Sequence, residues 1–328
     1  MPRSEATRCT ALTLLAFGVL TFGSCIPKDS KEPTGGAAAV DRGSEPSAPP
    51  PQNQASEAQD AGSDAQQVTP EPPAEPPGPK PLQAESEFQT LPVEGYRDGV
   101  IALPLGIKQK RPLLVALHGN YDRPEWQCMV WAELIQRQAF VVCPRGVPRT
   151  DAPKSEDRWT YGGIPDTLKE TFAALAAARA AYPEYIDPGP AMFTGFSLGA
   201  IYGVHALGAD AKKRAAYGAG EEPPFGYAVL VEGGYQGWYL GRAKQFRADG
   251  AQGVVFGCGQ YACRAKASGL VKLLERADLR VGVGFGGNVG HTYDGQVAAA
   301  VAAELPAMFG DDPRWKPVVD ALGAAESR

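Results

Sequence analysis

Beyond about residue 88, the chain alternates short apolar runs with longer segments of helical periodicity. An apolar run bounded by turn residues is typical of a buried strand, and apolar positions three or four residues apart are typical of one helix face. We predict strands at 96–104, 112–117, 140–143, 191–194, 227–231, 253–256 and 281–285, and helices at 125–138, 166–182, 264–277 and 296–309. This alternation predicts the α/β class, in which helices cover both faces of a mostly parallel central sheet.

The predicted strand 191–194 runs directly into a G-x-S-x-G sequence that spans 195–199 and has Ser197 at its centre. Alone, such a pattern is a weak signal. Between a strand and a helix, however, the glycines allow a sharp turn that exposes the serine hydroxyl at the helix N-terminus. Developing negative charge is stabilised at that position. Ser197 is therefore the candidate nucleophile.

The segment 186–200 resembles the nucleophile turn of secreted polyhydroxybutyrate-depolymerase-like and feruloyl-esterase-like enzymes of the α/β-hydrolase superfamily. The superfamily resemblance covers roughly 96–309, in the order strand, His-Gly loop, nucleophile turn and late histidine. It implies the α/β-hydrolase fold and the hydrolysis of an ester, thioester or amide.

A serine hydroxyl needs a neighbouring base, and the chain contains three histidines. His118 lies in the His-Gly loop, which in the family shapes the oxyanion region. His205 lies about two helical turns beyond Ser197 on the same predicted helix. His291 follows the last predicted strand, where the family carries its base. We therefore expect His291 to be the base, with an ordinary loop histidine as the alternative.

Two backbone N–H groups stabilise the oxyanion in this family. One belongs to the residue after the nucleophile and the other to the loop after an early strand. In this chain the resemblance assigns these roles to Leu198 and to either Asn120 or Tyr121.

The acid that orients the base departs from the family pattern. The loop after the predicted strand 253–256 usually supplies an aspartate, but here Gln260 occupies the expected place. Glutamine can hydrogen-bond a histidine but cannot stabilise an imidazolium by charge. Glu232 follows the preceding strand and is our candidate acid. Asp294 is the alternative, although acidic residues near such a position often begin a helix.

The first 87 residues predict export and anchoring instead of a packed core. Residues 1–24 carry two arginines before a short apolar stretch and read as a signal peptide. The segment that ends at Cys25 resembles a bacterial lipobox, which implies acylation of Cys25; an unmodified cysteine after an ordinary signal peptide is the alternative. Residues 25–87 are rich in Pro, Ala and Glu and predict a disordered linker before a hydrolase domain at 88–328. We expect a lipid-anchored protein of the cell envelope, periplasmic or at the cell surface.

Four cysteines remain once Cys9 and Cys25 are set aside: Cys128, Cys143, Cys258 and Cys263. An even number suits an oxidising compartment. Among the possible pairings, the local one, Cys128 with Cys143 and Cys258 with Cys263, closes the shortest loops. Free buried thiols are the alternative.

Composition limits the partners. The net charge is −5, and no basic run stands outside the N-terminal region, so we expect no nucleic-acid partner. Nothing in the sequence demands a metal or an organic cofactor. Three functions stay open: a serine esterase acting on a small-molecule or polymeric ester, a serine peptidase of the same fold, and a non-catalytic envelope protein that binds a ligand.

Overall fold

A computed structural model describes residues 79–220 and 224–326. The predicted signal peptide, Cys25 and nearly all of the predicted linker lie outside the described residues. Leu82 is buried and pairs through backbone hydrogen bonds with Gly106 and Ile107, so packing begins ahead of the predicted boundary at 87. Within the described residues, no helix is both long enough and apolar enough to cross a bilayer.

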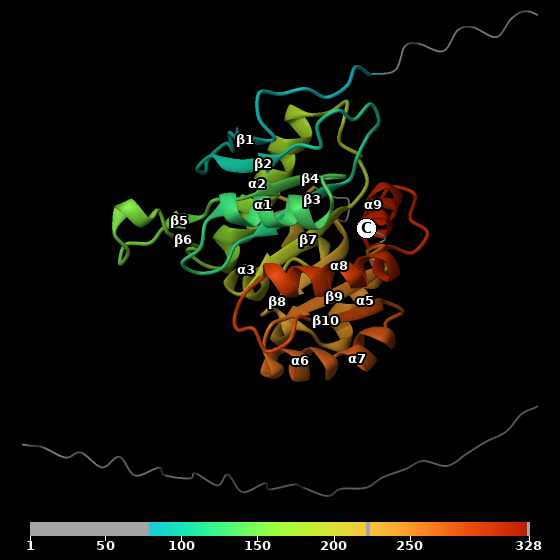
Figure 1. Cartoon of the computed structure of the whole chain (residues 1–328). Helices are drawn as coiled ribbons and strands as arrows, with labels where there is room; N and C mark the ends of the chain where they lie inside the picture. The colour runs from blue at the N-terminus through green and yellow to red at the C-terminus, as the bar shows by residue number, and fades with distance from the viewer. Residues whose placement is uncertain (1–78, 221–223, 327–328) are drawn as a thin grey trace, which may run out of the picture. The chain divides into compact units, whose positions relative to one another are not determined.

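An eight-stranded sheet forms the centre of the domain, with the order β1-β2-β4-β3-β7-β8-β9-β10 (Figure 1). β2 pairs antiparallel with both β1 and β4, and the remaining pairs are parallel. The strands are β1 (Phe88–Leu91), β2 (Gly99–Ala102), β3 (Leu113–Leu117), β4 (Phe140–Cys143), β7 (Ala191–Phe196), β8 (Phe225–Val231), β9 (Gly253–Cys258) and β10 (Arg280–Phe285). This is the α/β-hydrolase fold, so the predicted fold class is confirmed.

Helices cover both faces of the sheet because successive side chains of a buried strand point to opposite faces. In β3, Val115 belongs to one hydrophobic cluster, together with side chains of α2, α5, α6 and α7, whereas Leu114 belongs to a second cluster with α1, α8 and α9. The helices are α1 (Pro124–Leu134), α2 (Ile164–Ala181), α3 (Leu198–Gly203), α4 (Ala211–Ala216), α5 (Leu240–Ala248), α6 (Tyr261–Ser268), α7 (Val271–Glu275), α8 (Gly295–Phe309) and α9 (Lys316–Glu326).

Several element boundaries differ from the sequence prediction. α1 ends at Leu134 instead of 138, because Gln136 and Arg137 have φ of 53° and 54°, in the left-handed region that cannot continue a right-handed helix. The helix predicted at 264–277 is two helices, α6 and α7, that meet near Gly269. The edge strand β1 and helix α9 were not predicted.

A second, two-stranded sheet was also missed. It is a hairpin of β5 (Val147–Pro148) and β6 (Trp159–Thr160), with the 3-10 helix η1 (Lys154–Glu156) between its strands. The hairpin projects from the rest of the domain (Figure 1). Strands this short carry no periodicity from which they can be recognised.

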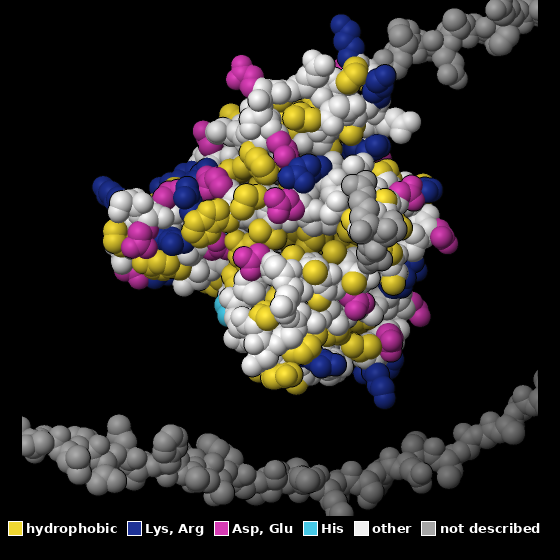
Figure 2. Space-filling model, in the orientation of Figure 1, with side chains coloured by type: hydrophobic (Ala, Val, Ile, Leu, Met, Phe, Trp, Pro, Cys, Tyr) yellow, Lys and Arg dark blue, Asp and Glu magenta, His cyan; other side chains and the backbone are white. Residues whose placement is uncertain are grey.

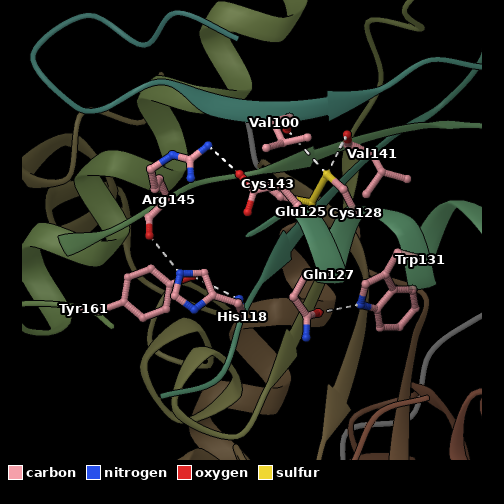
Figure 3. The surroundings of a disulfide bond; sticks show 10 residues. All are labelled: Val100, His118, Glu125, Gln127, Cys128, Trp131, Val141, Cys143, Arg145 and Tyr161. Carbon is pink, nitrogen blue, oxygen red and sulfur yellow. Dashed lines mark hydrogen bonds and ion pairs between the residues drawn. A yellow bond between two sulfur atoms is a disulfide. The ribbon is translucent and has the colours of Figure 1, made fainter. Parts of the chain in front are cut away.

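Both predicted local disulfides are present. Cys128–Cys143 joins α1 to the end of β4, with 5.8 Å between the Cα atoms (Figure 3). Cys258–Cys263 joins the end of β9 to α6, with 5.5 Å between the Cα atoms. The first bond fixes a helix to the sheet, and the second closes a tight loop at the carboxyl edge of the sheet.

Candidate active site

Ser197 occupies a sharp turn between β7 and α3. Its φ of 49° and ψ of −113° are strained for a residue with a side chain. The neighbouring glycines permit this turn through close packing: a Cβ on Gly195 would collide with the backbone of α3, and one on Gly199 would collide with the Leu117 carbonyl. The strand, turn and helix predicted around the G-x-S-x-G motif are therefore all present, and the serine stands at the carboxyl edge of the sheet.

A continuous hydrogen-bond chain links Ser197, His291 and Glu232. The Ser197 Oγ lies 2.8 Å from His291 Nε2, and His291 Nδ1 lies 3.2 Å from Glu232 Oε2. With the proton on Nδ1, the imidazole donates to the carboxylate, and its Nε2 lone pair accepts from the serine hydroxyl. The His291 side chain is 47% exposed and that of Glu232 is 2% exposed. The base therefore faces solvent while its carboxylate partner is buried beneath it.

The backbone holds Glu232 in place from two directions. Glu232 follows β8 with φ of 51°, which turns the side chain out of the strand direction. Its Oε1 accepts a hydrogen bond of 2.6 Å from the N–H of Gly259. Gly259 lies between Cys258 and Cys263, so the second disulfide closes the loop that presents this N–H. The carboxylate thus uses one oxygen for the loop and the other for His291.

The two other acid positions have different roles. Gln260 is the residue that precedes α6, and its carbonyl accepts from Arg264 N. Asp294 precedes α8 and accepts a hydrogen bond from the Thr292 hydroxyl. Among the described contacts, Glu232 is the carboxylate that meets His291. The signal in the sequence was its place directly after a predicted strand.

The structure separates the two loop residues considered as oxyanion donors. The Tyr121 N–H donates to the Trp159 carbonyl at 2.9 Å, so it already has an acceptor, which favours Asn120 of the two alternatives. The N–H of Asn120 has no acceptor among the described residues. Leu198 is the first residue of α3, where a backbone N–H lacks an intrahelical acceptor. Leu198 and Asn120 therefore remain the candidate donors.

The β5–β6 hairpin holds this loop in place, and sequence reasoning did not find it. Trp159 exchanges backbone hydrogen bonds with Tyr121 and Asp122 at 2.9 and 3.0 Å. The Asn120 side-chain oxygen accepts from Arg149 Nη1 and from the Thr160 hydroxyl, both at 2.7 Å. The hairpin therefore lies directly beside the loop that carries Asn120.

Arginine, acidic and aromatic side chains lie next to one another on the hairpin and on the segments that contact it. The Arg158 guanidinium lies 4.8 Å from the centre of the Trp126 ring, and that of Arg145 lies 5.0 Å from the Trp159 ring. Arg123 pairs with Asp157 at 2.6 Å. Figure 2 shows basic, acidic and hydrophobic side chains interspersed over the projecting region. Because the positive and negative charges are close in number, neither sign of charge dominates this surface.

The other two histidines are not bases for Ser197. His118 is fully buried; its ring stacks on Tyr161 with 4.5 Å between centroids, and its Nε2 lies 2.8 Å from the Arg145 carbonyl (Figure 3). Burial lowers the pKa of His118, since the charged form loses solvation. Burial also lowers the pKa of His205, which follows α3. His118 Nδ1 lies 2.7 Å from the Gly119 carbonyl, so its ring packs within the loop that carries Asn120.

The aromatic residues Trp159, Tyr161, Trp238 and Tyr239 differ in exposure, and two of them are core residues. Tyr161 and Trp238 are 5% and 6% exposed. Tyr239 is 57% exposed and stacks with Arg242, and Trp159 is part-buried in the hairpin. Only Trp159 and Tyr239 of this set are accessible to a bound molecule.

One group of candidate metal ligands occurs among the described residues: Glu232, Cys258 and Cys263. The two sulfur atoms are bonded to each other, so neither is a thiolate that can bind a metal. The cluster is the disulfide beside the buried acid.

No protein-family model and no curated protein matches the sequence. Several solved structures are similar. TT1662 from Thermus thermophilus is 14% identical over 68% of this chain and 98% of its own, with a TM-score of 0.46. A putative dienelactone hydrolase from Klebsiella pneumoniae is 14% identical over 68% of this chain and 97% of its own, with a TM-score of 0.45. An uncharacterized protein from Bacillus cereus is 14% identical over 63% of this chain and 62% of its own, with a TM-score of 0.46. At this identity the similarity concerns the fold alone.

Proposed function

We propose that this protein is a serine hydrolase that cleaves carboxylic esters through an acyl-enzyme on Ser197. The observation that carries the proposal is the hydrogen-bond chain from the Ser197 hydroxyl through His291 to the buried Glu232 carboxylate. A nucleophile, a base and an oriented acid in this sequence constitute the arrangement required for acyl transfer.

In the first half of the reaction, Ser197 Oγ attacks the ester carbonyl while His291 Nε2 takes the hydroxyl proton. The Glu232 carboxylate stabilises the imidazolium that forms, and the N–H groups of Leu198 and Asn120 donate to the oxyanion of the tetrahedral intermediate. The imidazolium then gives its proton to the departing alcohol. A water molecule, deprotonated by His291, releases the acid by the same steps.

The strongest argument for a non-catalytic protein is the absence of an acid at the position of Gln260. The presence of Glu232 counters that argument. A carboxylate is present after all, one strand earlier, and it is hydrogen-bonded to His291 at 3.2 Å. The second disulfide closes the loop whose Gly259 N–H binds that carboxylate. A ligand-binding protein has no need for so specific an arrangement.

Labelling with a fluorophosphonate tests the proposal, because a serine with a working base reacts with this probe whereas a solvated serine hardly reacts. We expect labelling of the wild type and of Ser268→Ala, a control at an exposed serine, and none of Ser197→Ala or His291→Ala. A wild type that is not labelled contradicts the proposal. A panel of short acyl esters and matched peptide amides then tests the preference for esters over peptides.

We further propose that the mature chain is anchored in the cell envelope by acylation of Cys25. The supporting observation is the lipobox-like segment that ends at this cysteine after a signal-peptide pattern. Cys25→Ser is expected to move the protein from the detergent phase to the aqueous phase of a phase-separation assay, and unchanged partitioning contradicts the anchor. Fluorophosphonate labelling is expected to be the same for both forms.

A further inference from the structure

We propose that the buried Asp122 carboxylate and the Tyr293 hydroxyl position the oxyanion-binding loop relative to the histidine loop. The inference rests on the proposed function, since it assigns a role in binding the oxyanion. Neither residue touches the reacting atoms, so both are positioning residues.

Asp122 is a buried carboxylate with donors on both of its oxygens. It is 6% exposed. Its Oδ2 accepts from the Gly119 N–H and from Gln127 Nε2, both at 3.3 Å, and its Oδ1 accepts from the Arg123 N–H at 2.8 Å. Gln127 in turn accepts from the indole of Trp131 at 3.1 Å (Figure 3). The carboxylate is therefore fixed to α1 and holds the N–H of Gly119, the residue immediately before Asn120.

Tyr293 brings the histidine loop to the same carboxylate. Its hydroxyl donates to Asp122 Oδ1 at 3.2 Å, across 171 positions of sequence. Tyr293 stands two residues after His291. Burial, followed by the charge of Asp122, raises the pKa of Tyr293, which keeps the hydroxyl protonated as a donor.

The ring of Phe196 fills the space between the two loops. Its centroid lies 4.6 Å from that of Tyr293 and 4.9 Å from that of His291. A Cβ on Gly119 would lie 2.6 Å from the same ring. The nucleophile turn, the histidine loop and the loop that carries Asn120 thus pack on one side chain, and the Asp122–Tyr293 hydrogen bond closes this assembly.

This arrangement predicts a specific kinetic effect. Removal of the Tyr293 hydroxyl leaves the hydrogen bonds of Asp122 within its own loop and α1 intact but breaks the hydrogen bond that joins the histidine loop to this carboxylate. We therefore expect the Asn120 N–H to be held less firmly relative to the oxyanion. The oxyanion is absent from the bound ester and forms only as the tetrahedral intermediate is approached. Weaker donation to the oxyanion therefore lowers kcat and leaves KM nearly unchanged. A purely structural role for the hydroxyl would lower stability without this selectivity.

The test compares Tyr293→Phe with Tyr227→Phe. Tyr227 is the control, because it is buried and likewise donates to an aspartate, Asp312, at 3.0 Å, but at the amino end of the strands. We expect both variants to lower Tm by a few degrees. Tyr293→Phe is expected to lower kcat about tenfold and to weaken a trifluoromethyl ketone inhibitor by the same factor, whereas Tyr227→Phe changes neither. The inhibitor is the informative probe, since it forms an oxyanion on the enzyme.

Equal kcat and inhibitor affinity in the two tyrosine variants would overturn the positioning role. A Tyr293→Phe enzyme in which KM rises and kcat is unchanged overturns it as well. Asp122→Asn, which replaces an acceptor oxygen by a donor, provides a second test: we expect it to show the same kcat and inhibitor losses, enlarged. A wild type that does not react with a fluorophosphonate contradicts the proposed hydrolase function itself. A wild type that reacts, with equal kinetics in the two tyrosine variants, contradicts only the positioning role.

Discussion

At the carboxyl end of the parallel strands, Ser197 and Glu232 both have positive φ and the His291 side chain is half exposed. At the amino end, the Tyr227 hydroxyl, the Asp312 carboxylate and the Arg314 guanidinium form a compact hydrogen-bonded group beside the stacked rings of Phe309 and Trp315. Both ends therefore join polar groups from distant segments. At the carboxyl end, however, two of the three residues in the hydrogen-bond chain have positive φ and the third is half exposed, whereas Tyr227, Asp312 and Arg314 all have negative φ and are at most one-quarter exposed.

This difference predicts whether a substitution changes the stability of the fold or the turnover of the proposed enzyme. We expect polar groups at the amino end to contribute chiefly to the free energy of unfolding, because they hydrogen-bond to one another. On the proposed function, we expect polar groups at the carboxyl end to contribute chiefly to turnover, because they act on a bound substrate.

The largest expected contrast is between one carboxylate at each end, the buried Glu232 and the part-buried Asp312. Glu232→Gln keeps the shape of the side chain but cannot stabilise an imidazolium, so we expect kcat to fall by about 10³- to 10⁴-fold. Asp312→Asn is the matched control and is expected to leave kcat unchanged. Ester hydrolysis under saturating substrate measures both. Asp294→Asn and Gln260→Ala are expected to retain kcat, and a severe loss in Asp294→Asn with Glu232→Gln intact would move the acid to Asp294.

The second contrast concerns a large apolar side chain at the amino end. Trp315 is fully buried, and its ring stacks on Phe309 with 4.5 Å between centroids. Trp315→Ala is expected to lower the free energy of unfolding by about 3–5 kcal/mol, through lost burial and a residual cavity. Trp126→Ala is the control, because this ring is 36% exposed and stacks between arginines. Denaturant titration measures the difference, and equal losses in the two variants would contradict the assignment.

The third contrast separates the two disulfides. The chain-entropy model gives about 3 kcal/mol for the separation of 15 residues in Cys128–Cys143 and about 2 kcal/mol for the separation of 5 in Cys258–Cys263. Replacing both cysteines by alanine is therefore expected to cost more stability at Cys128–Cys143. Only the Cys258–Cys263 replacement is expected to lower kcat, by several fold, because it loosens the Gly259 N–H that binds Glu232. Unfolding and ester hydrolysis on both double variants check this, and equal kcat values would show that the loop holds its shape without the bond.

The sequence allowed the sheet and the nucleophile to be predicted because each depends on local pattern. Apolar runs mark strands wherever both faces are buried, and the G-x-S-x-G motif places Ser197 between a strand and a helix. His291 followed from its position after the last strand. Glu232 remained one of several candidates, since the choice depends on how a side chain at one strand end meets a loop at another.

The support around the site depends on contacts that no local pattern records. Tyr121 and Asn120 are adjacent and each has one backbone N–H, yet the hairpin binds the N–H of Tyr121, whereas that of Asn120 has no acceptor within the described part of the chain. The hairpin strands contain two residues each, which is too few for any alternation to appear. Asp122 and Tyr293 are separated by 171 positions, and each read by itself is an ordinary loop residue.

The smallest expected contrast is the acid sensitivity of one ion pair at each end. Burial alone would raise the pKa of Asp312, but hydrogen bonds from Arg314 outweigh it, and the pKa of this carboxyl is lowered. A carboxyl whose pKa is lower in the folded state stabilises the fold above its unfolded pKa of about 4, and this contribution is lost as the pH falls through the folded value. Asp312→Asn is therefore expected to cost about 1 kcal/mol at pH 7, after allowance for solvent screening, and much less near pH 2.

Asp151 in the projecting hairpin supplies the comparison. Its carboxylate pairs with Arg149, whose hydrogen bond lowers the pKa of Asp151, but the pair lies open to solvent. Water and salt screen such a pair, so Asp151→Asn is expected to leave the free energy of unfolding nearly unchanged at both pH values. Urea titrations of the wild type and the two variants at pH 7 and near pH 2 measure the effect. If Asp312→Asn loses the same free energy at both pH values, then the fold depends on the hydrogen bonds of this side chain and not on its charge.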